Sequence, residues 1–212
     1  MNFNYTLVRS KRKTLAISIN GANQITVRVP LKTPLKRIES FVKEKTPWIN
    51  KILLANQANL SRGEEIINYK KILIEGTPIP LFIGQNNSFN DSCVCLKNVK
   101  NCKTVLLSAL QEKFLALFYS LSKATRIVAN SISFKDYKSR WGCCSGKNEI
   151  IFNYKLLMLS KRLQIYVIIH ELCHVIYHDH SKNFWSLVKK FNPDYKKDRA
   201  ELKTYAFITK LY

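Results

Sequence analysis

All four histidines of this chain lie between positions 170 and 180. The stretch begins with His170, Glu171 and His174, which form a His-Glu-x-x-His motif. Residues four apart lie one above the other on a helix, so His170 and His174 would present two imidazoles to one metal ion. Glu171 would lie about 100° around the helix from His170, beside the ion rather than bound to it. A zinc hydrolase needs its general base at such a position.

A catalytic zinc ion needs three protein ligands and one open position, so a third ligand must follow the motif. His180 is the preferred candidate, because it lies beyond the expected end of the helix, where the chain can turn back. His178 comes second, since on a straight helix it would lie about 12 Å along the axis from the first histidine. Glu201 comes third. The sequence therefore predicts a three-histidine zinc site that is completed by His180.

The helix that carries the motif is expected over Lys161–Tyr177, where Leu163 and Val167 continue an apolar pattern and Ser160 can act as N-cap. A strand is expected just before it, over Asn148–Leu157. If this strand lies at the edge of a sheet, it can pair with an extended peptide substrate. The alternative is an ordinary core strand, which would contribute packing and no substrate contact.

Short segments rich in β-branched and aromatic residues predict strands in the N-terminal third: Tyr5–Arg9, Thr14–Ile19 and Gln24–Pro30. Asn20-Gly21 predicts a turn between the last two. A helix is expected from Pro34, with an interruption at Pro47, and the polar stretch Ala55–Gly63 is expected to be a connector. These elements would form a small β-rich region with one helix.

Strand-like segments follow between Ile66 and Ser108, and an amphipathic helix is expected over Ala109–Ala129. A boundary near residue 105 would separate an N-terminal region, 1–104, from a C-terminal domain, 105–212. The boundary is soft, because the two halves could share one core and form a single unit.

The chain of 212 residues has 35 lysines and arginines against 14 acidic residues, a formal net charge of +21. Such a charge attracts polyanions, so a nucleotide or nucleic acid is an expected partner of the basic surface. The basic residues are spread along the chain, however, and a biased composition is the favoured explanation of the charge. The N-terminus lacks a secretory signal and the apolar runs are too short to span a membrane, so a cytoplasmic protein without membrane contact is expected.

The six cysteines are expected to be reduced thiols rather than a disulfide framework. The pairs Cys93/Cys95 and Cys143/Cys144 lack the two-residue spacer and the matching second pair of a zinc ribbon. A cysteine metal site is therefore disfavoured.

Several blocks of the chain, in this order, are similar to one known family: Val8–Lys13, Phe41–Ile49, Ser139–Ser145, Ile150–Leu157, the histidine helix, Ser181–Trp185 and Pro193–Lys196. Together they cover most of the chain, and they resemble the YgjP-like metallopeptidase family. The resemblance implies an α+β fold, in which a small β-rich N-terminal region precedes a zincin-like metallopeptidase domain with its HExxH helix.

The resemblance also implies a zinc cofactor, with ligands carried over to His170, His174 and His180 and the base to Glu171. Two positions depart from the family pattern. Cys143 stands where the family usually has serine, which removes any role of that hydroxyl. His178 is an additional histidine that could compete for the metal.

The function expected from this resemblance is a zinc metallopeptidase that cleaves peptide or protein substrates. The related SprT-like proteases, some of which act on DNA-bound proteins, would suit the basic charge. A nucleoside triphosphate pyrophosphatase activity is a second alternative, although the sequence shows no glycine-rich phosphate loop and no acidic cluster for magnesium. A nucleic-acid-binding protein with structural zinc is a third. Tyr195 and Arg199 are candidates for stabilising an oxyanion, with ordinary packing as the alternative for Tyr195.

Overall fold

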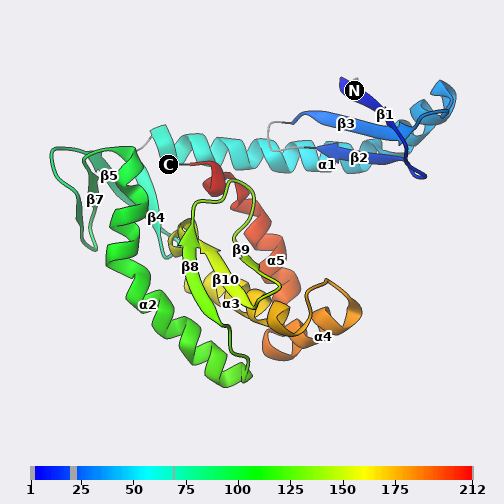
Figure 1. Cartoon of the computed structure of the whole chain (residues 1–212). Helices are drawn as coiled ribbons and strands as arrows, with labels where there is room; N and C mark the ends of the chain where they lie inside the picture. The colour runs from blue at the N-terminus through cyan, green and yellow to red at the C-terminus, as the bar shows by residue number, and fades with distance from the viewer. Residues whose placement is uncertain (1–2, 20–22, 69, 212) are drawn as a thin grey trace. The chain divides into compact units, whose positions relative to one another are not determined.

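The computed structural model describes residues 3–19, 23–68 and 70–211, and Figure 1 shows its helices together with three small sheets. The expected α+β class is confirmed. The chain divides into two compact units, Met1–Arg62 and Gly63–Tyr212. The boundary expected near residue 105 falls inside the second unit, because the segments on both sides of it contribute to one hydrophobic core.

The first unit contains a three-stranded sheet in which β3 (Ile25–Pro30) is central. It pairs parallel with β1 (Tyr5–Ser10) and antiparallel with β2 (Ala16–Ile19). Alternate residues of β3 are buried, as expected for a strand with one face on a core. They form a cluster with apolar residues of the following helix: Ile25, Val27, Val29, Ile38, Val42 and Ile49. The expected turn at Asn20-Gly21 lies outside the described residues.

Helix α1 (Leu35–Asn68) runs through Pro47 without interruption, so the predicted break is wrong. The proline removes one helical hydrogen bond, at a cost of about 3 kcal/mol in a helix interior. Buried apolar residues on either side of it, Val42 and Ile49, keep the helix against the sheet and offset this cost. The predicted connector Ala55–Gly63 is also helical, because alanine, glutamine and leucine favour helix over irregular structure.

The second unit begins with a four-stranded sheet in the order β4-β5-β7-β6. The strands are β4 (Lys71–Ile74), β5 (Thr77–Ile83), β6 (Ser88–Phe89) and β7 (Val94–Leu96). The turn between β4 and β5 is tied to the segment before the histidine helix by a 2.9 Å hydrogen bond from the Gly76 amide to the Met158 carbonyl. Gly76 has φ +89°, and a Cβ there would lie 3.1 Å from Ser160 Cβ, so only glycine fits this turn.

Helix α2 (Cys102–Thr125) begins and ends earlier than predicted and stops at Arg126, whose φ of 59° is left-handed. With the preceding turn it forms a segment, Val99–Thr125, that is long and apolar enough to cross a membrane by length and composition alone. Core helices pass the same test. One face of α2 packs into the main core through Leu106, Phe114 and other buried residues.

The sheet next to the histidine helix has the order β8-β10-β9, with β8 (Ser131–Lys135), β9 (Gly142–Cys144) and β10 (Glu149–Asn153). The strand predicted over 148–157 is therefore β10 followed by a 3-10 turn, η2 (Tyr154–Met158). It lies in the middle of the sheet and not at its edge, so of the two alternatives the ordinary core strand is correct and pairing with an extended substrate is not. Both its backbone edges are used by neighbouring strands.

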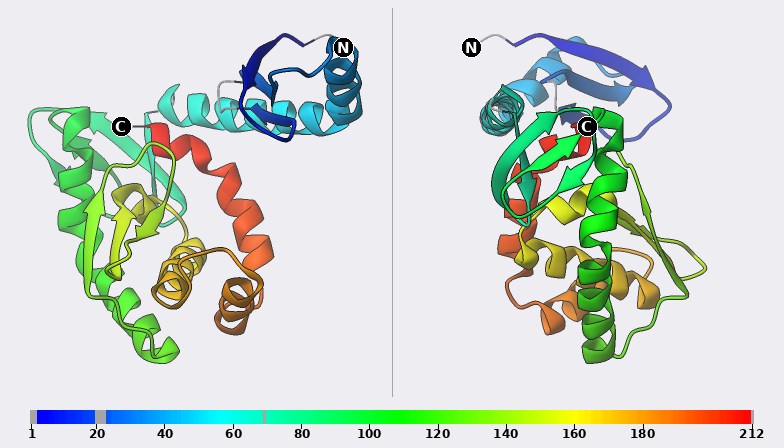
Figure 2. Two further views of the ribbon diagram at one scale, coloured as in Figure 1. Left: turned by 45° about the vertical axis from the view of Figure 1, so that its right-hand side comes forward. Right: turned by 90° about the vertical axis from the view of Figure 1, so that its left-hand side faces the viewer.

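Helix α3 (Lys161–Ile176) carries the histidine motif and contacts α2, α5 and β9. It also contacts α4 (Lys182–Phe191), which follows a short loop, and α5 spans Tyr195–Thr204. Figure 2 shows α3, α4 and α5 next to one another. A final 3-10 turn, η3 (Ala206–Lys210), adds Phe207 and Ile208 to the main core.

Candidate metal centre

The three histidines predicted to bind zinc come together from the helix and from the loop that follows it. One ring nitrogen of each of His170, His174 and His180 lies within 4.8 Å of the others. The Nε2 atoms of His170 and His180 are 3.2 Å apart. Tetrahedral zinc with bonds of 2.0–2.1 Å places its ligand atoms roughly 3.4 Å apart. The donor set therefore fits a zinc ion, and one pair already has the required spacing.

The loop after α3 places the third histidine. The helix ends at Tyr177, whose backbone is extended (φ −129°) and turns the chain out of the helix. Asp179 Oδ1 then accepts a 3.1 Å hydrogen bond from the Ser181 amide, and Ser181 caps α4 by accepting from the Phe184 amide. These local turns fold His180 back toward α3.

Both helical histidines are prepared to act as ligands. His174 Nδ1 lies 2.9 Å from the Tyr177 carbonyl oxygen and donates to it, which leaves the Nε2 lone pair for a metal. Burial lowers the pKa of His170 to about 3, with smaller contributions from His174, His180 and Arg199, so this imidazole is neutral at pH 7. Burial likewise lowers the pKa of His174, against the opposing effect of its hydrogen bond. Neutral imidazole is the form that binds metal.

Phe184 of α4 contacts all three histidine rings. It stacks on His174 at 4.3 Å between ring centroids, and meets His170 and His180 edge-on at 5.0 and 4.9 Å. The side chain is fully buried. No motif in the sequence predicts a role for Phe184, although it stands in the Ser181–Trp185 block. It is the residue that fixes the rings relative to one another.

Glu171 is 5% exposed and lies beside the histidines on α3. Burial raises the pKa of its carboxyl group to about 8, against a smaller lowering effect of the Arg140 charge. Its Oε2 atom is buried and has no hydrogen-bond partner among the described residues. Such an atom carries a desolvation cost that a bound polar group would relieve. A reacting water is a group of that kind.

Gly142 of β9 passes directly over Glu171. A Cβ at this position would lie 2.8 Å from Glu171 Cγ and 2.9 Å from Oε1, closer than real contacts allow. The glycine therefore leaves the space that the buried carboxyl group occupies.

If Glu171 is the base that the sequence predicts, we expect Gly142→Ala to displace its carboxyl group and to lower activity by tenfold or more, because a misplaced catalytic group costs about a hundredfold per ångström. Zinc content should be unchanged, because the ligands do not touch the new methyl group. Gly146→Ala is the matched control, since a Cβ there meets nothing within 4 Å. Steady-state kinetics with zinc analysis would check this. Equal activity of both variants would show that the close approach has no functional consequence.

A loop of residues 136–141 joins β8 to β9, and its Tyr137 lies close enough to Glu171 to be affected by its charge. Tyr137 Oη lies 3.3 Å from Cys143 Sγ. That hydrogen bond, followed by burial, raises the pKa of Tyr137, and the Glu171 charge adds to the effect. Cys143 of β9 thus forms a hydrogen bond with this loop.

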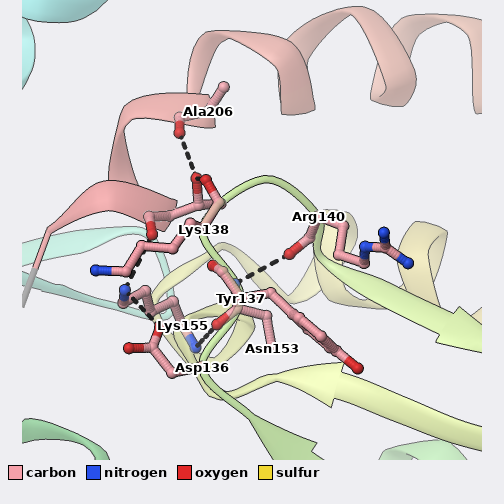
Figure 3. Close-up of polar contacts among 8 residues, drawn as sticks. Asp136, Tyr137, Lys138, Arg140, Asn153, Lys155 and Ala206 are labelled. Carbon is pink, nitrogen blue, oxygen red and sulfur yellow. Dashed lines mark hydrogen bonds and ion pairs between the residues drawn. The ribbon is translucent and has the colours of Figure 1, made fainter.

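Two buried side chains hold this loop in place (Figure 3). Asn153 Nδ2 donates to the carbonyl oxygens of Tyr137 and Arg140, at 2.8 and 3.0 Å. Lys155 Nζ, which is fully buried, donates to Asp136 at 2.8 Å and to the Thr209 carbonyl at 3.0 Å. A loop that carries site residues is thereby tied to both the sheet and the C-terminal turn.

We expect Asn153→Asp to destabilise the protein by about 2–4 kcal/mol, because two carbonyl groups lose their donor and a carboxyl group replaces a fully buried amide. The side chain keeps its size, so packing is preserved. Asn130→Asp is the matched control, since Asn130 Nδ2 donates at 2.7 Å to the Lys147 carbonyl at an exposed site. Its cost should stay below about 1 kcal/mol. Urea unfolding would measure both, and equal costs would contradict a special role of the buried bonds.

The other candidate ligands lie apart from the three histidines. His178 is exposed and does not belong to the group. Glu201 pairs with Arg162, as does Asp198. Among the described residues, no cysteine joins a metal-binding group. Tyr195 stacks on Trp185, which in turn contacts His170 and His180, so it reaches the histidines through that ring.

Comparison with known proteins identifies the family. The model of the YgjP-like metallopeptidase domain matches residues 13–205. The solved structure of the metallopeptidase zymogen abylysin of Pyrococcus abyssi is similar at 23% identity and a TM-score of 0.40, over 43% of this chain and 92% of that one. No curated protein matches significantly. Because the family model spans nearly the whole chain, both units included, the protein belongs to the YgjP-like metallopeptidase family.

Proposed function

We propose that the protein is a zinc-dependent peptidase in which His170, His174 and His180 hold the metal and Glu171 acts as general base. The observation that carries the proposal is the convergence of three imidazoles beside one buried carboxyl group. Membership in a metallopeptidase family agrees with it.

When bound, zinc in such a site acts as a Lewis acid on the substrate carbonyl and lowers the pKa of water at its open position to about 7. The chain's own part is to move a proton. Glu171 Oε2, which is buried without a partner, takes the proton of the attacking water and passes it to the leaving amine. Glu171 must be ionised to take the proton, and the positive charge of a bound zinc ion would favour that form against the effect of burial, which favours the protonated form.

The number of ligands favours catalysis over a structural role. Structural zinc sites have four protein ligands, whereas catalytic sites have three and an open position. The group contains three side chains, and across the described residues neither His178 nor a cysteine joins it. A nucleic-acid-binding protein that uses zinc only for stability is therefore the weaker proposal.

The position of β9 supports an extended peptide as substrate. It is an edge strand, and Gly142 lies against Glu171. A peptide that pairs with the outer edge of β9 would bring a backbone carbonyl next to the base. Pairing with an extended peptide, which the sequence offered as one alternative for β10, is thus proposed for β9.

The test is digestion of a mixture of proteins and peptides by the purified full chain, with new termini identified by mass spectrometry. We expect cleavage that a chelator removes and zinc restores. Nucleoside triphosphate hydrolysis would be measured on the same preparations. Zinc-dependent nucleotide hydrolysis without any peptide cleavage would replace this proposal with the pyrophosphatase alternative.

A further inference from the structure

A cavity of about 360 Å³ opens next to Trp185, the residue that follows Phe184 on α4. It is lined by residues of α4 and α5: Trp185, Tyr195, Lys196, Arg199, Ala200 and Lys203. Trp185 joins this cavity to the metal centre, because its ring lies 5.5 Å from the His180 ring and 5.7 Å from the His170 ring, centroid to centroid. A ligand group in the cavity would therefore lie one aromatic ring away from the metal.

The charges of α5 are sorted between two faces of the helix. Lys196, Arg199 and Lys203 are spaced three and four residues apart, so they share the face that lines the cavity. The acidic residues Asp198 and Glu201 both pair with Arg162 of α3, and Asp198 is almost fully buried. The cavity lining thus contains three cations and no carboxylate.

Arg199 is held ready to bind an anion. Its guanidinium carbon lies 4.7 Å from the centroid of the Trp185 ring, and Trp185 also stacks on Tyr195 at 5.3 Å. Contact through the face of the guanidinium would leave its N–H groups in the plane, where they match a carboxylate in a two-pronged geometry. Within the described part of the chain, neither Arg199, Lys196 nor Lys203 forms a salt bridge.

The geometry points to a subsite in this cavity that binds a carboxylate group of the peptide substrate and so gives the enzyme a preference for acidic peptides. The inference rests on the proposed peptidase function and deepens it. Two sources could supply the carboxylate: an aspartate or glutamate side chain, or the C-terminus of the peptide. Both would be held by Arg199 through two hydrogen bonds, with Lys196 and Lys203 adding charge.

The experiment uses the full chain loaded with zinc and short peptides on one neutral scaffold, labelled with an uncharged fluorophore. Glutamate or glutamine is placed at each position in turn, and every peptide is made with a free and with an amidated C-terminus. The ratio of kcat/KM for each charged peptide and its neutral counterpart is measured. Binding to the Glu171→Gln variant is followed by fluorescence anisotropy, which needs no turnover.

We expect at least one charged peptide to be preferred by about tenfold, as charge-assisted hydrogen bonds provide. The preference should disappear in Arg199→Gln and in the double variant Lys196→Gln/Lys203→Gln, which leaves the Trp185 stack intact. Lys197→Gln is the matched control, because Lys197 is an exposed lysine of the same helix outside the cavity lining. If the preference is lost when glutamine replaces glutamate in the peptide, the subsite binds a side-chain carboxylate. If it is lost when the C-terminus of the peptide is amidated, the subsite binds the C-terminal carboxylate.

Equal values for charged and neutral peptides would overturn the inference, and so would a preference that Lys197→Gln reduces as much as the cavity variants do. These results can be told apart from failure of the proposed function. If the wild type cleaves no peptide but binds charged peptides selectively through Arg199, the subsite stands and the peptidase assignment falls. If the wild type cleaves charged and neutral peptides equally well, the peptidase assignment stands and the subsite falls.

Discussion

Glu171→Gln should lower kcat by about 10²–10⁴-fold while the protein still binds one zinc ion per chain. Glutamine has the shape of glutamate, so it fits beneath Gly142, but it cannot accept the proton of the attacking water. Glutamine is neutral at every pH. The Glu171 carboxyl group, with its pKa of about 8, is also mostly neutral at pH 7 in the metal-free protein, so folding should be preserved. Kinetics on a cleaved peptide and zinc analysis of the same sample would measure both effects.

Glu149→Gln serves as the matched control, because Glu149 is an exposed glutamate in β10 of the same unit. Its activity should stay within about twofold of wild type, since surface substitutions of this kind have small effects. Full activity of Glu171→Gln would remove Glu171 from the mechanism. Loss of zinc together with activity would instead mean that the carboxyl group supports the ligands.

His180→Ala should lose zinc. Removal of a residue that only hydrogen-bonds to a metal ligand lowers metal affinity roughly 10–100-fold, and removal of a ligand itself should lower it more. The variant keeps the two histidines of α3, and two imidazoles do not supply the three protein ligands that a catalytic zinc site has. Helix α3 itself should remain folded, because its core contacts do not involve His180. Elemental analysis and competition with a chromophoric chelator would give the stoichiometry and affinity.

His178→Ala is a close control, as it removes an exposed histidine from the same loop. It should retain about one zinc per chain and full activity. If His178→Ala loses zinc and His180→Ala does not, the loop adopts a different arrangement when metal binds, and the ligand set is His170, His174 and His178.

The sequence predicted the elements whose signals are local. The helix over residues 161–177 was predicted almost to the residue, because its apolar residues recur at helical spacing. The preference for His180 over His178 followed from the length of a helical turn, and the structure places His180, not His178, within the group of three rings. The family followed from the order of several motifs and not from the histidines alone.

The sequence could not predict features that depend on contacts between distant segments. Pro47 carries a strong local helix-breaking signal, yet packing of Val42 and Ile49 on the sheet overrides it. The central place of β10 depends on which strands flank it, and a strand's own residues do not encode its neighbours. Gly142 lies in a strand and Glu171 in a helix, so the spacing of residues along the chain does not predict their close approach.

The packing of Phe184 against all three histidine rings has a consequence for how fast the metal can exchange. A ligand on a mobile loop can swing away alone, and ions then leave through a series of partly bonded states. Here each ring touches a side chain that is itself buried in the cluster formed by α3 and α4. If these histidines hold a metal ion as proposed, its stepwise release would be coupled to local opening of that cluster, and we expect exchange of the ion to be slow.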